Sequence, residues 1–241
     1  MMRVATFNVR HGLAEGAAEP APEATTAVAA ALRADVLALQ ELDVGVRRSG
    51  GTDQIAMVRA ASEPSSARFA RTLDVDGGAY GVGLVVRGVL SEVEDRPLSG
   101  AGEPRVAIIA RVELADGAGD GDRRAPFTVA ATHLQNDRRV ARTQLVELLT
   151  ALDERPGPTV VLGDFNLPPF VVEGTCAELG WDAVANTATF PARSPSVQID
   201  WVVVRGFELV AVVVPDVRVS DHRPVVAELR PSTGPRVPST G

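Results

Sequence analysis

Short apolar runs recur along the chain, and each is bounded by Gly, Pro, Asp or Asn. Runs of this length, rich in Val, Ile and Leu, are typical of β-strands. Several are apolar at every position, as expected of strands that are covered on both faces. Strands are therefore predicted over Val4–Val9, Val36–Gln40, Gly81–Val86, Val106–Leu114, Phe127–Thr132, Thr159–Leu162, Ile199–Val204, Leu209–Val214 and Pro224–Leu229.

Helical patterns are fewer. Segment Glu23–Arg33 is rich in Ala and directly follows Pro22, a favoured residue at a helix start. Segment Arg138–Asp153 places apolar residues on one helical face. Because many strands are separated only by turns, the pattern favours two packed, mainly antiparallel sheets with helices outside. Shorter helices are predicted over Thr52–Ala60 and Val171–Leu179.

The length of 241 residues fits one large domain, which we predict over residues 1–230, followed by a disordered tail over 231–241. Segments Leu13–Ala21 and Ala115–Arg124 are predicted to be mobile loops. No apolar run reaches membrane-spanning length, and no signal peptide is recognised at the N-terminus. A soluble, cytoplasmic protein is expected.

The net charge is −7, and all 24 basic residues are Arg. Proteins that hold long nucleic acids usually present a basic stripe, which this sequence does not show. Cys176 is the only cysteine, which excludes an internal disulfide and zinc sites built from several cysteines.

Polar residues follow or interrupt the predicted strands at several places. Taken singly, each such segment is common as a turn or a polar loop, so the indication lies in their joint occurrence. Strand ends can converge at one edge of a sandwich and share a pocket. The segments are Thr6-Phe7-Asn8, Leu39-Gln40-Glu41-Leu42-Asp43, Thr132-His133-Leu134, Gly163-Asp164-Phe165-Asn166, Gln198-Ile199-Asp200-Trp201 and Ser220-Asp221-His222-Arg223-Pro224.

Carboxylates stand in apolar surroundings at Glu41, Asp164, Asp200 and Asp221. They rarely occur there unless they are paired or bind a cation. An oxygen-rich set without cysteine suits Mg²⁺ or Mn²⁺ better than zinc.

Two histidines add acid/base chemistry. With Asp200 available to orient it, His222 resembles a member of a His–Asp acid/base pair. His133 can donate to a phosphate oxygen as charge develops. Asn8 and Asn166 supply neutral groups that can hold a phosphate or an attacking water.

The ordered set of motifs closely resembles the signature of the endonuclease/exonuclease/phosphatase superfamily, over residues 3–229. Gly-Asp-Phe-Asn followed by Ser-Asp-His is its most specific part. The matching residues are Asn8, Gln40, Glu41, His133, Gly163, Asp164, Phe165, Asn166, Asp200, Ser220, Asp221 and His222.

The resemblance implies a deoxyribonuclease-I-like, four-layered α/β sandwich and magnesium-dependent hydrolysis of a phosphoester. It implies that Glu41 is the principal metal ligand, with Asn8 and Asp221 nearby. It also implies that Asp164 orients or activates the attacking water and that Asn166 contacts the phosphate.

By the same resemblance, His222, aligned by Asp200, is the second acid/base or phosphate-binding group. The resemblance also implies that His133 stabilises the transition state. The pattern leaves open whether Asp164 or His222 takes the proton of the water.

Segments Arg47–Gln54, Gly77–Gly81 and Glu103–Arg105 are similar to bacterial members that resemble sphingomyelinase-like and lipid-remodelling phosphodiesterases. Arg48 and Arg105 are candidates to bind a substrate phosphate or carboxylate, the alternative being ordinary surface ion pairs.

The chain departs from the family pattern at two positions. Val82 stands where many relatives have Asn. Arg10 stands where repair nucleases have Asp, which disfavours an abasic-site nuclease and makes Arg10 a candidate to meet a phosphate. His11 is treated as a loop residue.

The main hypothesis is metal-dependent hydrolysis of a phosphodiester, or a phosphomonoester, of a small or lipid-like molecule by a monomer. The alternative is a nuclease acting on DNA or RNA, and a third hypothesis is a catalytically silent binding domain. The nuclease would need a basic rim around the site, for which the candidates are Arg10, Arg47, Arg48, Arg138 and Arg139.

Overall fold

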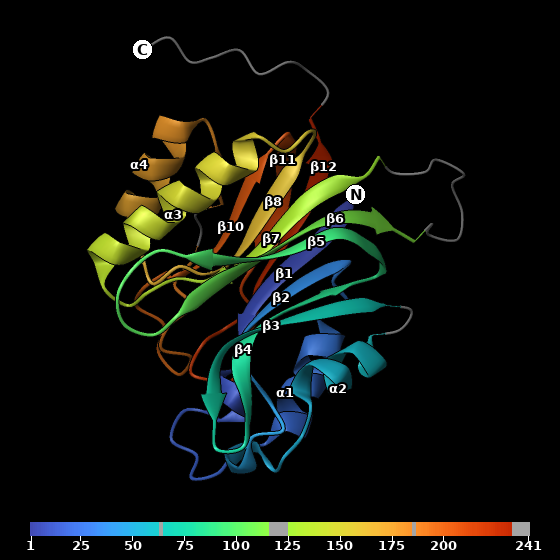
Figure 1. The fold of residues 1–241 in the computed structure, drawn as a ribbon, viewed down its shortest axis with the longest axis vertical. Helices are drawn as coiled ribbons and strands as arrows, with labels where there is room; N and C mark the ends of the chain where they lie inside the picture. The colour runs from blue at the N-terminus through green and yellow to red at the C-terminus, as the bar shows by residue number, and fades with distance from the viewer. Residues whose placement is uncertain (63–64, 116–124, 185–186, 233–241) are drawn as a thin grey trace.

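The computed structural model describes residues 1–62, 65–115, 125–184 and 187–232. Its strands form two sheets of six strands each (Figure 1). The first sheet has the order β11-β12-β1-β2-β4-β3. Its members are β1 (Met2–Asn8), β2 (Val36–Val44), β3 (Ser66–Val75), β4 (Gly78–Val86), β11 (Phe207–Val213) and β12 (Val225–Pro231).

The second sheet has the order β5-β6-β7-β8-β10-β9. In each sheet one pair of neighbours is parallel, β1 with β2 and β7 with β8, and the other pairs are antiparallel. Its members are β5 (Gly88–Leu98), β6 (Arg105–Leu114), β7 (Phe127–His133), β8 (Thr159–Asp164), β9 (Asp182–Ala183) and β10 (Asp200–Arg205).

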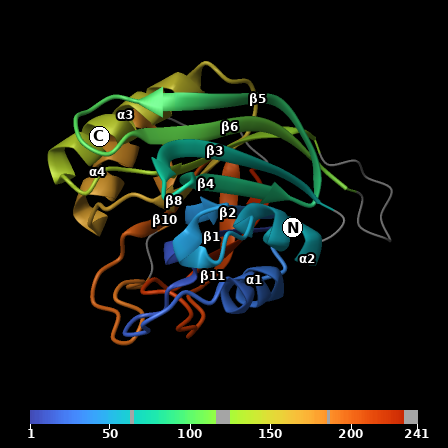
Figure 2. The same ribbon diagram turned by 60° about the horizontal axis from the view of Figure 1, so that its bottom comes forward.

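Helices cover the outer face of each sheet (Figures 1 and 2). Helices α1 (Pro22–Ala31) and α2 (Gln54–Ala61) pack on the first sheet, and α3 (Arg138–Asp153) and α4 (Pro169–Leu179) pack on the second. One apolar cluster lies between the two sheets, and one lies under each helix pair. The predicted four-layered α/β sandwich is therefore confirmed.

Each predicted strand and helix overlaps an observed one, but three strands have no counterpart in the prediction. Strand β3 lies at the edge of the first sheet, while β5 and β9 lie at the two edges of the second. In β3 only Ala70 is buried, and in β5 only Leu98. Because an edge strand exposes most of its side chains, it lacks the apolar run that marks the central strands.

Several predictions concern residues at the limits of the described chain. Residues 13–21 contain no helix or strand. Most of the predicted loop over Ala115–Arg124 and of the predicted tail lies outside the described residues. Among the four described stretches, no helix has the length and apolar character needed to cross a bilayer.

The strand register brings the polar motifs together. In the parallel pairs, Asn8 lies opposite Gln40 and His133 lies opposite Asp164. Strand β10 runs antiparallel to β8, so Asp200 at its start also lies opposite Asp164. The carboxyl ends of β1, β7 and β8 thus meet the beginning of β10 at one edge of the sandwich.

Candidate active site

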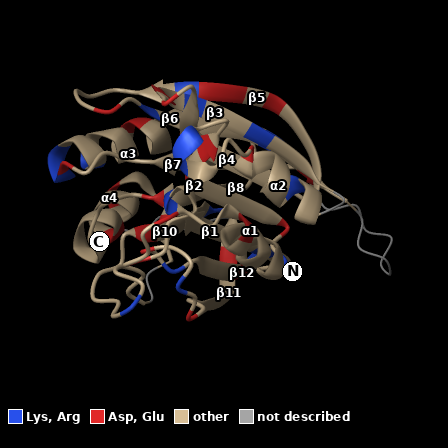
Figure 3. Cartoon of the chain, turned by 90° about the horizontal axis from the view of Figure 1, so that it is seen from below, with Lys and Arg blue, Asp and Glu red and all other residues tan. Residues whose placement is uncertain are grey.

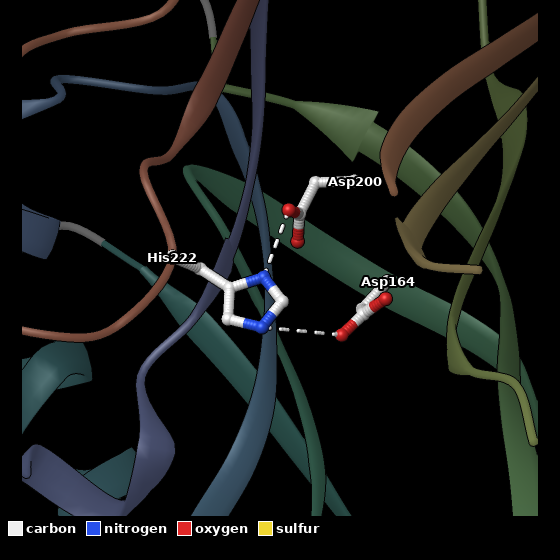
Figure 4. A group of neighbouring side chains, drawn as sticks. All are labelled: Asp164, Asp200 and His222. Carbon is white, nitrogen blue, oxygen red and sulfur yellow. Dashed lines mark hydrogen bonds and ion pairs between the residues drawn. The ribbon is translucent and has the colours of Figure 1, made fainter. Parts of the chain in front are cut away.

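A histidine lies between two buried carboxylates at this edge (Figure 4). His222 Nδ1 is 2.9 Å from Asp200 Oδ2, and His222 Nε2 is 3.7 Å from Asp164 Oδ2. The hydroxyl of Thr189 donates to the same Asp200 oxygen over 2.5 Å. The imidazole is therefore oriented by Asp200, with its second nitrogen directed toward Asp164.

The charges of this group are coupled. Burial would lower the pKa of His222, but the carboxylates of Asp200 and Asp164 outweigh it and raise that pKa to about 10. Burial raises the pKa of Asp164, and the charge of His222 opposes this increase. In the metal-free protein His222 is therefore an imidazolium at neutral pH.

Asn8 connects the two sheets. Its amide nitrogen donates to Glu41 Oε1 on β2 and to Asp164 Oδ2 on β8, each over 3.0 Å. Its side-chain oxygen accepts from the backbone NH of Arg10, and its carbonyl accepts from the Ser220 hydroxyl. Two carboxylates from different sheets are thus held on either side of one amide.

Glu41 has a strained backbone, with φ of 58°. The pairing of β2 with β4 shifts register between Leu39 and Leu42, so Glu41 lies in a bulge. Burial raises the pKa of Glu41, and the Asn8 hydrogen bond opposes this. A left-handed conformation costs about 1–3 kcal/mol and persists only where the surrounding structure enforces it, and bulges of this kind are over-represented beside active sites.

His133 and Asn166 lie on the other side of Asp164. His133 Nε2 is 3.5 Å from Asp164 Oδ2 and 3.2 Å from the amide nitrogen of Asn166. That amide also donates to the Leu134 carbonyl, and Asn166 has φ of 53°. Burial, followed by the charges of Arg105 and His222, lowers the pKa of His133 well below its ordinary value, so this imidazole is neutral.

The candidate substrate-binding arginines differ in their surroundings. Arg48 donates to the buried Asp43 through Nε and Nη2, over 2.9 and 2.8 Å. Arg10 Nε is 3.4 Å from Asp221 Oδ2. Arg105 bonds Glu103, but its side chain is only 4% exposed, and within the described part of the chain its Nε has no partner.

Charge around the site is mixed. Seen from below, blue and red segments are interspersed and do not form a basic stripe (Figure 3). Among the candidate rim residues, Arg10 and Arg48 are paired as described, and Arg47 lies 3.8 Å from Asp76. The guanidinium of Arg138 lies 5.9 Å from the centre of the Phe170 ring.

Among the described residues, two groups of side chains are candidates to hold a metal ion. Ligand atoms of Asp164, Asp200 and His222 lie within 4.8 Å of one another, although their mutual ion pairs already account for this proximity. The second group consists of Glu41 and Asp221, whose negative charge acts on Glu41. The carboxylate oxygens of these two residues are ligands that fit a hard cation such as Mg²⁺.

The structure brings together all the residues predicted for catalysis and metal binding. It also adds Thr189 to the site, as a donor to Asp200. No sequence pattern marks Thr189, because a threonine in a polar loop resembles many others.

Comparison with known proteins identifies one matching family model. Residues 5–222 match the model described as "Endonuclease/Exonuclease/phosphatase family". No match was found among the curated proteins.

Several solved structures share the fold. An endonuclease/exonuclease/phosphatase from Beutenbergia cavernae has a TM-score of 0.75 and 22% identity, covering 95% of this chain and 71% of that one. A mannosyl-6-phosphatase from Bacteroides thetaiotaomicron has a TM-score of 0.72 and 17% identity, and the match covers 95% of this chain and 100% of that one. The catalytic domain of human Nocturnin, with bound sulfate, has a TM-score of 0.68 and 19% identity, and the match covers 96% of this chain and 94% of that one.

Proposed function

The chain belongs to the endonuclease/exonuclease/phosphatase family, and we propose that it hydrolyses a phosphodiester, or a phosphomonoester, of a small or lipid-like molecule by in-line attack of water. The arrangement that carries this proposal is Asp164, held between the Asp200–His222 pair and the amide of Asn8. Hydrolysis of this kind needs a positioned base and donors around the phosphate.

Asp164 orients the attacking water and accepts its proton. Its carboxylate is fixed by Asn8 and by the backbone NH of Asn166, so it points in one direction. His222, aligned by Asp200, donates a hydrogen bond to a phosphate oxygen as negative charge develops there, and His133 stabilises the transition state from the other side of Asp164. The Asn166 amide contacts the phosphate beside His133.

Glu41, with Asn8 and Asp221 beside it, would hold Mg²⁺ or, as a second choice, Mn²⁺. A cation bound there would supply positive charge to offset the negative charge on a phosphoryl oxygen. Asn8 keeps Glu41 next to Asp164, so the cation-binding carboxylate and the water-orienting carboxylate are set at a constant separation.

The buried Arg105 is the strongest candidate for a phosphate contact, because its charge acts on both Glu41 and His133. Arg10 and Arg48 lie at the rim, where each is paired with an aspartate. They bind the outer part of the substrate through their remaining donors.

The same machinery would serve a nuclease, which is the second candidate function. Three of the arginines that would form its basic rim are in ion pairs with aspartates, which supports a small substrate instead. The fold shared with a mannosyl-6-phosphatase is in line with this preference. We further propose a monomeric, cytoplasmic protein with one domain over residues 1–230.

A panel of substrates tests the function. Bis-p-nitrophenyl phosphate, p-nitrophenyl phosphate, a sphingomyelin-type lipid and a plasmid are incubated with and without Mg²⁺. We expect Mg²⁺-dependent cleavage of a small ester or the lipid, with the plasmid intact. Salt-sensitive nicking of the plasmid would favour the nuclease, and calorimetry that detects no metal binding would favour a silent binding domain.

The Asp200–His222 pair yields a pH-dependent prediction. A folded-state pKa of about 10, above the ordinary 6.5, means that protonated His222 stabilises the fold. This contribution is complete below pH 6.5 and is lost as the pH rises through about 10. In Asp200→Asn the pKa of His222 falls by about 1–3 units, because a carboxylate partner is removed.

The measurement is an NMR titration of metal-free protein labelled at histidine. The chain has only three histidines, so His222→Ala assigns the signal. Thr189→Val is the matched control, because it removes a hydrogen bond to Asp200 but leaves its charge. An unchanged His222 titration in Asp200→Asn would contradict the pairing.

A further inference from the structure

The loop after β1 is held in an unusual backbone conformation. Arg10 and His11 are consecutive residues with φ of 44° and 45°. Non-glycine residues seldom adopt this region, at a cost of about 1–3 kcal/mol each. Such strain persists only where the surrounding structure enforces it.

Hydrogen bonds from separate elements enforce it here. The Asn8 side chain accepts from the Arg10 NH over 3.0 Å, and Gln54 Nε2 donates to the His11 carbonyl over 2.8 Å. The other end of the Gln54 amide accepts from the Asp43 NH over 2.9 Å. The His11 loop is thereby attached to β2 and to the start of α2.

Asp43 is also the anchor of the neighbouring arginine. Its carboxylate is fully buried, accepts from two nitrogens of Arg48, and accepts from the Ser49 hydroxyl. A buried charge is costly unless it is paired and hydrogen-bonded. One connected polar network therefore holds both the side chain of Arg48 and the backbone of His11.

Two ion pairs lie close enough to His11 for their charges to act on it. The charges of the Arg48–Asp43 and Arg10–Asp221 pairs all act on its imidazole. Burial, followed by Arg48, lowers the pKa of His11, which leaves the ring uncharged at neutral pH. Its Nδ1 is buried and has no partner among the described residues, while the residue as a whole is half-exposed.

These surroundings select for a particular kind of ligand. An uncharged imidazole offers one donor and one acceptor, and each guanidinium beside it is already balanced by a carboxylate. A second phosphate would find little net positive charge, and an alkyl chain would leave polar groups unpaired. Hydroxyl groups, which both donate and accept, match this set.

We propose that His11 and Arg48 bind the hydroxyl groups of the substrate's alcohol, so that the substrate is the phosphate ester of a sugar or similar polyol. The proposal rests on the proposed function and adds the class of alcohol. His11 is then a specificity-determining residue that contacts the substrate away from the reacting phosphorus.

The test compares His11→Ala with wild type on two kinds of ester. Hexose 6-phosphates and glycerophosphodiesters carry hydroxyl-rich alcohols, whereas p-nitrophenyl phosphate and bis-p-nitrophenyl phosphate do not. We expect kcat/KM for the polyol esters to fall about tenfold or more, mainly through KM, because lost uniform binding acts on KM. The p-nitrophenyl esters should change less than about twofold.

Two further variants keep the test interpretable. Arg33→Ala is the matched control, because Arg33 has φ of 50° but lies after α1, away from the site. His11→Asn retains a residue that tolerates positive φ and removes the imidazole, so it serves if the alanine variant fails to fold. Arg33→Ala should leave hydrolysis of every ester unchanged, whereas His11→Asn should reproduce the selective loss on the polyol esters.

The outcomes separate the two levels of inference. Equal losses on both kinds of ester in the His11 variants, or no loss at all, would overturn the role of His11. Wild-type turnover of the p-nitrophenyl esters with no turnover of any polyol ester would overturn the substrate class and leave the proposed function standing. Silence on every ester with Mg²⁺ present would count against the proposed function itself.

Discussion

Asp164→Asn should lower kcat by about a thousandfold or more and leave the protein folded. Asp164 lies at the centre of the site. Asn8 and the backbone NH of Asn166 donate hydrogen bonds to its carboxylate. His133 and His222 lie on either side of it. An amide of the same shape cannot accept a proton from water at neutral pH. Steady-state hydrolysis with saturating Mg²⁺ measures the loss.

The folded state of this variant has two opposing changes. The amide provides one acceptor oxygen where the carboxylate provides two, so one hydrogen bond to Asn8 or Asn166 is lost. The substitution also removes the negative charge of Asp164. Burial disfavours that charge, as the raised pKa of Asp164 shows, so its removal favours the folded state. We expect the unfolding midpoint to stay within about 4 °C of wild type.

Asp74→Asn is the control, because Asp74 is an exposed residue on the edge strand β3 whose ion pair among the described residues is a local one with Arg71. It should match wild type in both activity and unfolding. Full activity in Asp164→Asn would exclude Asp164 as the base, and loss of activity accompanied by unfolding would point to a structural role.

Glu41→Gln should abolish the response of the protein to Mg²⁺. The substitution keeps the shape of the side chain and its hydrogen bond with Asn8 but removes the charge that attracts the cation. Activity should fall by about a thousandfold, the scale expected when a main source of transition-state charge stabilisation is lost. The shift of the thermal unfolding midpoint on addition of Mg²⁺ is a second measurement of metal binding, and it does not depend on turnover.

In wild type, Mg²⁺ at about 100 times its Kd should add about 2.7 kcal/mol to the free energy of unfolding. In Glu41→Gln this increment should vanish, while the metal-free variant should be at least as stable as wild type, because burial raises the pKa of Glu41. Glu113→Gln, an exposed position on β6, is the matched control. A retained Mg²⁺ increment would move the cation to Asp164, Asp200 and His222.

The sequence alone was sufficient for the central strands and for the longest helix. The core of β8 is an unbroken apolar run, and the spacing in Arg138–Asp153 matches α3 from end to end. Local chemistry determines such elements, because burial on both faces requires apolar residues and a helical face requires their regular spacing. The order of the motifs along the chain was likewise enough to indicate the family.

The details of the site depended on contacts between distant residues. Asn8 meets Asp164 across 156 positions of sequence, and Ser220 meets the Asn8 carbonyl across 212. The bulge that strains Glu41 arises only when β2 pairs with β4. No local pattern carries these contacts, since they exist only after the sheets have packed.

The arginines show the same division. The sequence offered two roles for Arg48 and for Arg105, a substrate contact or an ordinary surface pair. Tertiary structure separates them, because Asp43 is buried beneath Arg48 and binds two of its nitrogens, while Arg105 is itself buried near Glu41. Residue types and their order along the chain determined which chemistry is available to this protein. Packing decided which of these groups are left unpaired to carry it out, because burial and pairing are properties of the folded molecule alone.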